Sequence, residues 1–445
     1  MKKMKMESVS WTKKEPKYDK REVLFEADID QEENKLLNIY TDIKDQIWNG
    51  FGGAATESAA YVYSKLSEEK KKLFLEKYFG KDGLNYKTIR VPIDSCDFSL
   101  EQFEAGKEGS CDEFSMERAG KYILPLLEDI KSYTNNEISL FLSPWSPPVA
   151  FKDVDTRHAG GRLLPKYYDA YAAYLCRYIE EYKNRGYKVE MLSIQNEAKA
   201  VQTWDSCVYT AEEEKEFLVH HLKPAMVKRG HGDILVFVWD HNKERIFDRA
   251  RITLSGEGGE CADGAAFHWY SGDHFEMLDL FRKQFPNKKL ILSESCLEYS
   301  ILDVSNPFLN AAKIAHEIIG DMKHGMEMFF DWNMLLDEKG GPNYVGNFCH
   351  APMMYDEKKE QLELTSLYDC FYQFSNYLEI GDVRVETSSY TKDIEAVAFQ
   401  GVDDTLKVIA LNHSSEDKEF ILRNVAKDEI AKCILPKQSL TTFIG

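Results

Sequence analysis

Apolar runs recur along the middle of the chain, and most of them are separated by segments whose apolar residues repeat at helical spacing. The runs end near Ala55, Asp94, Trp145, Glu197, His241, Tyr270, Glu294 and Asn333. A continuous apolar run predicts a parallel strand buried on both faces, and an amphipathic helix between two runs predicts a βαβ unit. Eight such runs predict an α/β fold, a (β/α)8 TIM barrel over residues 48–379. A doubly wound sheet is the alternative, but it usually has fewer strands and a glycine-rich first turn.

Helical spacing between and after these runs predicts the helices of the barrel. They are expected at residues 58–78, 115–134, 166–185, 211–229, 275–285, 308–324 and 364–378. Beyond residue 379 the pattern changes to short β-like runs separated by turn residues such as Ser414 and Ser415, which predicts an attached antiparallel β-sandwich domain over residues 380–445. Residues 1–47 are charged and mixed, with β-like segments at 22–29 and 36–43 that we expect to join this sandwich.

Two of the apolar runs end in a glutamate. The run VEMLSIQNEA places Asn196 and Glu197 at a strand end, and KKLILSESC does the same for Glu294. A carboxylate at the end of a buried strand is costly unless it has a partner or a task. Taken singly, either glutamate is explained by an ordinary salt bridge. Two of them at strand ends of one barrel favour paired-carboxylate chemistry, for which glycoside hydrolysis is the leading case.

Other polar and aromatic residues also collect at the predicted strand ends. They are Glu57, Arg90, Asp94, Trp145, Asn196, Trp239, Asp240, His268, Tyr270, Trp332 and Asn333. In barrel enzymes, function is found at this end of the strands. Core packing explains any single tryptophan, but Trp145 and Trp332 both end strands beside polar residues. Aromatic rings stack on the apolar faces of sugars, so the set favours a carbohydrate site.

Composition excludes several classes of partner. A formal net charge of -19 argues against nucleic acid and anionic membrane surfaces. No apolar run approaches membrane-spanning length, and the N-terminal lysines lack the apolar stretch of a signal peptide. The nine cysteines, an odd number without CxxC spacing, indicate reduced thiols. We therefore expect a cytoplasmic protein without membrane insertion; the oligomeric state stays open.

Motifs for metals and cofactors are weak. The adjacent His220 and His221 would point apart on a helix, and His268 and His274 lack partners at ligand spacing, so neither a metal nor a cofactor is expected. The glycine-rich stretch 50–53 lacks the pattern of a phosphate loop, which argues against nucleotide binding. Cys296 lies two residues beyond Glu294, and a buried structural thiol is the favoured interpretation over a nucleophile.

The motifs GFGGAATES, IRVPIDSCDFS, SPWSPP, QNEA, HWY, SESC and DWNMLLDEKGGPNY follow one another in order. Together they resemble glycoside hydrolase family 30, the family of glucosylceramidase, over roughly residues 48–445. The resemblance implies a TIM barrel with a β-sandwich and a retaining mechanism, with Glu197 as acid/base and Glu294 as nucleophile. It also implies that Asn196 bonds the sugar 2-hydroxyl, that His268 and Tyr270 support the nucleophile, and that the glycone site is lined by Glu57, Trp145, Trp332 and Asn347.

Two departures from the family pattern leave the substrate open. Glu57 stands where many relatives carry aspartate, and Ala198 replaces a frequent proline. We expect a bacterial enzyme that hydrolyses a terminal β-linked sugar from an imported small glycoside or oligosaccharide. The alternatives are a β-xylosidase, an endo-β-1,6-glucanase and a non-catalytic carbohydrate-binding protein. For Glu57 the alternative is an ion pair with Arg90 and no contact with substrate. The mechanism itself requires a raised pKa for Glu197 and an ionised Glu294.

Overall fold

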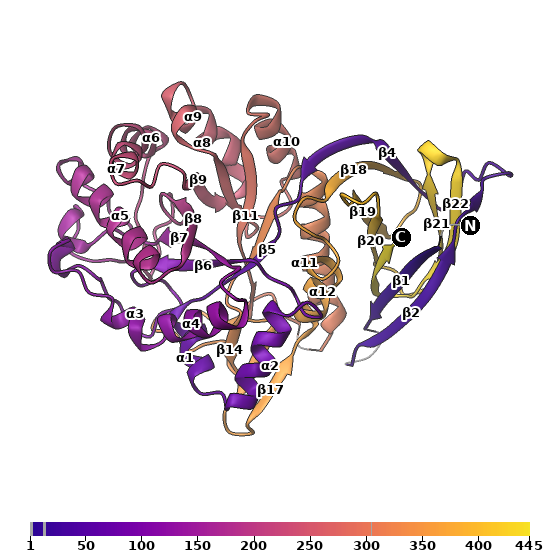
Figure 1. Cartoon of the computed structure of the whole chain (residues 1–445), viewed down its shortest axis with the longest axis horizontal. Helices are drawn as coiled ribbons and strands as arrows, with labels where there is room; N and C mark the ends of the chain where they lie inside the picture. The colour runs from indigo at the N-terminus through magenta and orange to yellow at the C-terminus, as the bar shows by residue number, and fades with distance from the viewer. Residues whose placement is uncertain (1–2, 12–14, 304) are drawn as a thin grey trace.

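The computed structural model describes residues 3–11, 15–303 and 305–445, and it contains two units that lie side by side (Figure 1). The larger unit is a barrel surrounded by helices, and the smaller is a curved, sheet-rich unit that holds both chain ends. Within the described ranges, no helix combines the length and the apolar character needed to cross a membrane. The architecture is the barrel with an attached β-sandwich that the hydrophobic pattern predicts.

Eight parallel strands close into the barrel, in the spatial order β10-β11-β13-β5-β6-β7-β8-β9. They are β5 (Phe51–Ala54), β6 (Thr88–Ile93), β7 (Ser139–Pro144), β8 (Lys188–Ser193), β9 (Leu235–Asn242), β10 (Gly264–His268), β11 (Lys289–Ser295) and β13 (Met328–Asp331). All eight predicted barrel strands are confirmed. Phe141, Phe237 and Phe330 pack together inside the barrel. Alternate side chains on the same strands face the surrounding helices, which is why the runs are apolar throughout.

Strand β5 carries glycines because its neighbours approach it closely. A Cβ atom on Gly52 would lie 2.5 Å from the carbonyl oxygen of Thr88 and 2.6 Å from the ring of Phe330. A Cβ atom on Gly53 would lie 2.6 Å from the side chain of Met334. Backbone must shift to relieve the first of these contacts, so the glycines serve the packing of the first barrel strand.

The helices surround the barrel, and several are shorter than the pattern predicts. They are α1 (Glu57–Ser64), α2 (Glu68–Phe79), α3 (Glu117–Lys121), α4 (Ile123–Tyr133), α5 (Tyr168–Asn184), α6 (Ala211–Phe217), α7 (Lys223–Lys228), α8 (Ile246–Thr253), α9 (Glu257–Cys261), α10 (Phe275–Gln284), α11 (Pro307–Lys323) and α12 (Ser366–Ser375). The predicted helix 58–78 is divided because Ser67 accepts a hydrogen bond from the Lys70 N–H and starts α2 as its N-cap. The predicted helix 211–229 contains a π-helical turn at Leu218–Leu222. The short helices α8 and α9 are not predicted by the pattern.

A ten-stranded sheet forms the second unit, in the order β2-β1-β23-β20-β19-β18-β4-β21-β22-β3. Its strands are β1 (Lys3–Ser10), β2 (Lys17–Leu24), β3 (Glu26–Ala27), β4 (Leu36–Ile47), β18 (Val383–Ser389), β19 (Ile394–Gln400), β20 (Leu406–Asn412), β21 (Lys418–Asn424), β22 (Glu429–Leu435) and β23 (Ser439–Ile444). The sheet curls until β2 lies against β22 and encloses an apolar core that includes Phe25, Phe420 and Phe443. Pairing within it is antiparallel except between β4 and β21.

The N-terminal strands are integral to this sheet. Strand β1 pairs with β23, and β4 lies between β18 and β21. The sequence pattern does not predict β1, because its lysines suggest a solvated segment. In the structure Met4 and Met6 alternate with exposed lysines and point into the sandwich core. The two ends of the chain therefore meet in one sheet.

Short strands extend the loops at the carboxyl ends of β11 and β13. They are β12 (Leu297–Glu298), β14 (Leu335–Asp337), β15 (Cys349–His350), β16 (Met353–Asp356) and β17 (Gln361–Leu364). Strand β12 pairs with β15, while β14, β16 and β17 form a small sheet of their own. These additions lie at the end of the barrel where the predicted site residues collect.

A cluster of three side chains bridges the two units. His316 of α11 lies with its Nδ1 atom 2.7 Å from Glu395 Oε2 on β19. His413 Nε2 lies 2.6 Å from Glu395 Oε1. The barrel and the sandwich are thus joined by charged groups as well as by apolar packing.

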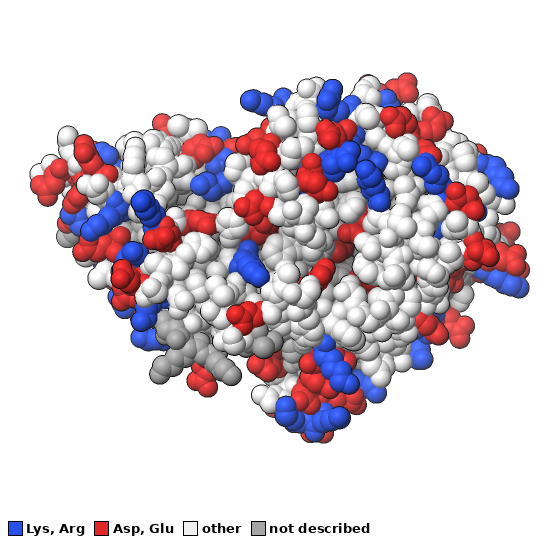
Figure 2. Space-filling model, turned by 180° about the vertical axis from the view of Figure 1, so that it is seen from behind, with Lys and Arg blue, Asp and Glu red and all other residues white. Residues whose placement is uncertain are grey.

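Charged residues of both signs are mixed on the molecular face seen in Figure 2, and Lys and Arg form no continuous area on it. Nucleic-acid binding depends on basic side chains that neutralise phosphates. This face offers no such surface, in keeping with the net charge of -19.

Candidate active site

The backbone leaves regular extended geometry where the barrel strands end. Several residues there adopt a left-handed conformation although they are not glycine: Asp94 (φ 61°), Glu197 (φ 50°), Trp239 (φ 74°), Asp240 (φ 47°) and Asn333 (φ 68°). The pairing of β10 with β9 also shifts register between Ala266 and Phe267. Such conformations cost about 1–3 kcal/mol each and persist where the surroundings require them. Here they accompany the polar residues at the barrel mouth.

Glu294, the predicted nucleophile, is held by two direct donors. Arg90 Nη1 lies 2.7 Å from its Oε2 atom, and the Tyr270 hydroxyl donates to Oε1 over 3.0 Å. The carboxylate lies on β11 with its side chain 9% exposed. These bonds fix the orientation of Glu294 and stabilise its charged form.

Glu197, the predicted acid/base, lies just beyond β8 with its side chain 13% exposed. Its backbone N–H donates to the carbonyl of Asp240 over 2.7 Å, which anchors the left-handed turn. The Oε1 atom lies 3.3 Å from His268 Nδ1 and 3.7 Å from His241 Nδ1. Two imidazoles therefore face the same carboxylate oxygen.

His268 lies between the two glutamates. Its Nε2 atom is 3.2 Å from Asp240 Oδ1 and 3.9 Å from Glu294 Oε2. Burial opposes a charged imidazole, but the surrounding carboxylates, that of Glu294 first, raise the pKa of His268 to about 9. The sequence resemblance assigned His268 to the support of the nucleophile; its closer contact is with the acid/base Glu197.

Arg90 and Asp240 form a buried ion pair beneath the glutamates. The Arg90 guanidinium is fully buried, and its Nη2 atom lies 2.9 Å from Asp240 Oδ2 and 2.8 Å from Asn196 Oδ1. Ser143 and Ser193 donate hydroxyl bonds to Asp240 over 3.0 and 2.5 Å. Burial acts to raise the pKa of Asp240, but Arg90 and the hydrogen bonds hold it well below its usual range. The hydrophobic pattern places both residues at strand ends, with Arg90 as an alternative partner of Glu57 and Asp240 without a role.

The pKa directions of the two glutamates differ from the expected split. Burial acts to raise both pKa values. For Glu197 the two histidines overcome burial and lower the pKa, whereas for Glu294 burial and the charge of Glu197 outweigh the opposing His268 and Arg90. The direct contacts favour the other order, because a charge-assisted bond of 2.7 Å stabilises a carboxylate more than contacts of 3.3 and 3.7 Å. We assign the lasting charge to Glu294 from these contacts.

Trp145 and Trp332 stack on each other beside the carboxylates. Their ring centroids are 5.1 Å apart with planes inclined by 20°, and both side chains are almost fully buried. The Arg90 guanidinium lies 4.9 Å from the Trp145 ring and 5.4 Å from the Trp332 ring. The two rings thus support the cation that holds Glu294, and a contact with sugar stays a prediction.

Glu57 has a partner that sequence reasoning did not find. Its Oε1 atom lies 2.6 Å from Arg118 Nε, and its Oε2 atom accepts a bond from the Leu100 N–H over 2.8 Å. The alternative prediction, an ion pair between Glu57 and Arg90, is wrong, because Arg90 pairs with Asp240 and Glu294 instead. Glu57 is 1% exposed.

Asp97, in the loop after β6, is a site residue that sequence reasoning missed. It is buried, and its Oδ1 atom has no hydrogen-bond partner among the described residues. Asn347 Nδ2 donates to its Oδ2 atom over 3.3 Å. Burial raises the pKa of Asp97 well above its usual range, and the charges of Glu294 and Glu197 add to the rise. Its place within the motif IRVPIDSCDFS was the available signal.

Cys296 lies near the nucleophile but is buried among other groups. Its Sγ atom is 3.1 Å from Cys349 Sγ and 3.4 Å from the Tyr270 hydroxyl. The contact with Cys349, together with burial, raises the pKa of the Cys296 thiol well above its usual range. A high thiol pKa disfavours nucleophilic chemistry, which agrees with the interpretation as a structural thiol.

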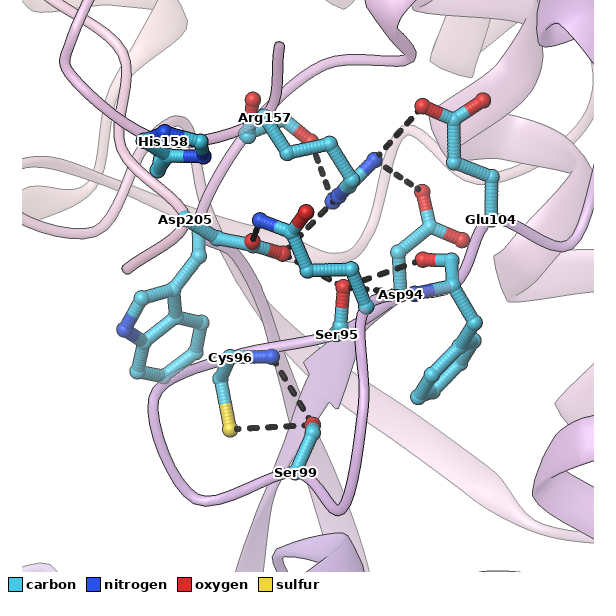
Figure 3. Close-up of polar contacts among 12 residues, drawn as sticks. Asp94, Ser95, Cys96, Ser99, Glu104, Arg157, His158 and Asp205 are labelled. Carbon is cyan, nitrogen blue, oxygen red and sulfur yellow. Dashed lines mark hydrogen bonds and ion pairs between the residues drawn. The ribbon is translucent and has the colours of Figure 1, made fainter. Parts of the chain in front are cut away.

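A second buried arginine, Arg157, links the loops around the site through ion pairs (Figure 3). Arg157 Nε lies 2.8 Å from Asp205 Oδ2, while its Nη1 atom lies 3.1 Å from Glu104 and 3.6 Å from Asp94. The Ser95 hydroxyl also donates to Asp205. These residues come from the loops after β6, β7 and β8, so the Arg157 guanidinium connects three loops at the carboxyl end of the barrel.

A cavity of about 790 Å³ opens at the other end of the barrel. It is lined by residues that start barrel strands, among them Thr88, Ser139, Lys188 and Met328. Neither Glu197 nor Glu294 lines it. In TIM barrels this end contributes stability, whereas chemistry occurs at the carboxyl ends. The candidate site is therefore the cluster around Glu197 and Glu294.

Comparison with known proteins gives consistent matches over nearly the whole chain. Residues 48–378 match the model of the glycosyl hydrolase family 30 TIM-barrel domain, and residues 381–443 match that of the glycosyl hydrolase family 30 beta sandwich domain. Lysosomal acid glucosylceramidase of Mus musculus is 29% identical over 402 residues, which cover 86% of this chain and 78% of the relative. Endo-1,6-beta-D-glucanase of Neurospora crassa is 22% identical, over 90% of this chain and 85% of the relative. The crystal structure of SrfJ from Salmonella typhimurium matches with a TM-score of 0.94 and 31% identity, over 100% of this chain and 99% of that chain.

Proposed function

The chain belongs to glycosyl hydrolase family 30, and from this premise we propose that it is a retaining β-glycosidase that releases one terminal β-linked sugar. Membership makes it a glycoside hydrolase; the substrate and the roles of the glutamates are our proposal. The observation that carries the proposal is the convergence of Glu197 and Glu294 on opposite nitrogens of one imidazole, that of His268. The likeness to a glucosylceramidase supports a β-glucoside as the first substrate to try.

In the first step Glu294 attacks the anomeric carbon while Glu197 protonates the departing oxygen. In the second step Glu197 takes a proton from water, which hydrolyses the glycosyl-enzyme. Arg90 and Tyr270 keep the Glu294 carboxylate ionised and oriented for the attack. Glu197 must carry a proton before the first step, and its contacts with His268 and His241, at 3.3 and 3.7 Å, hold its charged form less firmly than the Arg90 bond of 2.7 Å holds that of Glu294.

An endo-acting enzyme is the second candidate, since the Neurospora crassa relative carries the name of an endo-1,6-beta-glucanase. The two candidates differ in their products. An exo-acting enzyme releases single sugars from nitrophenyl glycosides and from chain ends, whereas an endo-acting enzyme cuts β-1,6-glucan into oligosaccharides.

The test is a screen of nitrophenyl β-glucoside, β-xyloside, β-fucoside and β-galactoside beside β-1,6-glucan, with Glu294→Gln as the matched inactive control. Proton NMR of the first product should show the β-anomer, because two displacements retain configuration. An initial α-anomer would contradict the retaining mechanism. Oligosaccharide products from the glucan would favour the endo candidate. If neither the wild type nor Glu294→Gln hydrolysed any of these substrates, the result would favour a carbohydrate-binding protein.

A further inference from the structure

Glu197, His241 and His268 each bring a possible metal-ligand atom to one place, where Glu197 Oε1 faces the Nδ1 atoms of both histidines. They come from the ends of β8, β9 and β10. We propose that these three side chains form a binding site for a divalent cation of the zinc class, and that its occupation reversibly inhibits the enzyme. The cation-binding part stands on geometry alone, whereas the inhibition rests on the proposed function of Glu197.

The spacing of the donors already suits such an ion. Glu197 Oε1 lies 3.3 Å from His268 Nδ1 and 3.7 Å from His241 Nδ1, and one possible ligand atom from each of the three residues lies within 4.8 Å of the other two. Zinc bonds to nitrogen and oxygen measure about 2.0–2.1 Å, which places tetrahedral neighbours about 3.3–3.4 Å apart. Only small side-chain movements are therefore needed to bring all three donors into contact with one ion.

The nitrogens required are His241 Nδ1 and His268 Nδ1, and an ion would take the place of the hydrogen bond between His268 Nδ1 and Glu197 Oε1. His241 Nδ1 is buried without a hydrogen-bond partner among the described residues. His268 directs its other nitrogen, Nε2, to Asp240 Oδ1 over 3.2 Å. A carboxylate behind a ligating histidine is the usual arrangement in metal sites, because it fixes the ring and leaves the opposite nitrogen to the ion.

The donor set and its surroundings select the class of ion. Two imidazoles and one carboxylate suit zinc and similar borderline metals, whereas magnesium and calcium prefer oxygen ligands. The Glu197 and His241 side chains are 13% and 15% exposed, so the site faces the barrel mouth rather than the closed core. A water molecule can therefore complete a fourth position.

The cluster at the junction of the two units provides a contrast within the same chain. Around Glu395, the nitrogens of His316 and His413 lie at 2.7 and 2.6 Å. These are hydrogen-bond distances, and an ion would have to push the donors apart. We expect this cluster to bind zinc much more weakly, so His316→Asn is a matched control.

We expect inhibition because the ion would bind Glu197, the proposed acid/base. A carboxylate oxygen bound to a cation neither delivers a proton to the leaving group nor removes one from water. Both steps assigned to Glu197 would stop, and a chelator would restore them.

The experiment titrates zinc chloride into EDTA-treated, dialysed enzyme and follows binding by calorimetry. In parallel, hydrolysis of the best nitrophenyl glycoside is measured at each zinc concentration and normalised to the zinc-free rate of the same variant. Loss of a group that hydrogen-bonds to a metal ligand lowers metal affinity by about 10–100-fold. His241→Asn removes a ligand itself, so it should weaken zinc binding and zinc inhibition by at least about 100-fold. His316→Asn should behave as the wild type, and EDTA should reverse the inhibition. Thermal melting of each variant checks that it is folded.

Equal zinc affinity in the wild type and His241→Asn would overturn the proposed site, as would loss of binding in His316→Asn alone. Binding that depends on His241 but leaves hydrolysis unchanged would overturn the inhibitory role. Because calorimetry needs no substrate, a protein that binds zinc through His241 but hydrolyses no glycoside would contradict the proposed function and support the site.

Discussion

Arg90 is the side chain whose replacement tests the geometry of the site most directly. Its buried guanidinium lies 2.7 Å from Glu294 Oε2 and 2.9 Å from Asp240 Oδ2. Methionine has a similar length and no charge, so Arg90→Met leaves two buried carboxylates without the cation they share. Removing one partner of a buried ion pair costs about 3–5 kcal/mol of unfolding free energy. We expect a lower melting temperature and a still folded protein, because Asp240 keeps its serine and histidine partners.

The effect of Arg90→Met on catalysis concerns Glu294, which keeps the Tyr270 hydroxyl as its remaining direct donor. A lost hydrogen bond to a charged group is worth about 1.5–3 kcal/mol, or about 10–150-fold in kcat/KM when the bond acts in the transition state. Burial raises the pKa of Glu294, and Arg90 opposes this rise. Without Arg90 the pKa moves further up, less nucleophile is ionised at a given acidic pH, and the acidic limb of kcat/KM shifts to higher pH.

The assay is the pH profile of kcat/KM on an aryl glycoside for the wild type, Arg90→Met and Arg90→Lys. Arg90→Lys keeps the charge and should keep the acidic limb in place, while its single ammonium cannot reach both carboxylates and activity falls. Arg118→Met is the matched control for the position of the acidic limb, because Arg118 pairs with Glu57 and Glu101 and not with the nucleophile. An unshifted limb in Arg90→Met, with a loss below about threefold (~0.7 kcal/mol) in kcat/KM, would refute the role assigned to Arg90.

Azide should restore turnover to Glu197→Ala with a retained glycosyl azide and to Glu294→Gly with an inverted one; the opposite pattern of products would exchange the two roles. Glu57→Asp should lower kcat/KM on a glucoside, with a loss of transition-state stabilisation of about 1–3 kcal/mol, and should have a smaller effect on the 4-deoxy analogue. Equal losses on both substrates would mean that this carboxylate acts only through its arginine partner. Hydrogen bonding to Glu395 raises the pKa of His316 from 6.5 to about 9, so their pair stabilises the fold fully below pH 6.5 and loses this effect as the pH rises through about 9. Melting temperatures of the EDTA-treated protein should fall less over this range in Glu395→Gln than in the wild type, and identical slopes would show that the pair contributes nothing.

The barrel could be predicted because its signal is local. A parallel strand covered on both faces must be apolar along its length, so each of the eight runs could be recognised without knowledge of its neighbours. The positions of Glu197 and Glu294 followed in the same way, since each interrupts the polarity pattern at a strand end. Strand β1 was missed because its lysines mask the alternation of Met4 and Met6, and the division between α1 and α2 depends on the single cap Ser67.

The sequence by itself thus determined the strands, their order along the chain and the candidate carboxylates. Only the tertiary structure decided which side chains meet: Arg118 with Glu57, and His241 with Glu197 and His268. Each contact joins residues on different strands or loops, and its distance depends on barrel closure, strand register and local left-handed turns. A register shift of one residue turns a side chain to the other face of its strand. Contacts of this kind are set by the packing of the whole barrel, which no local pattern of polar and apolar positions encodes.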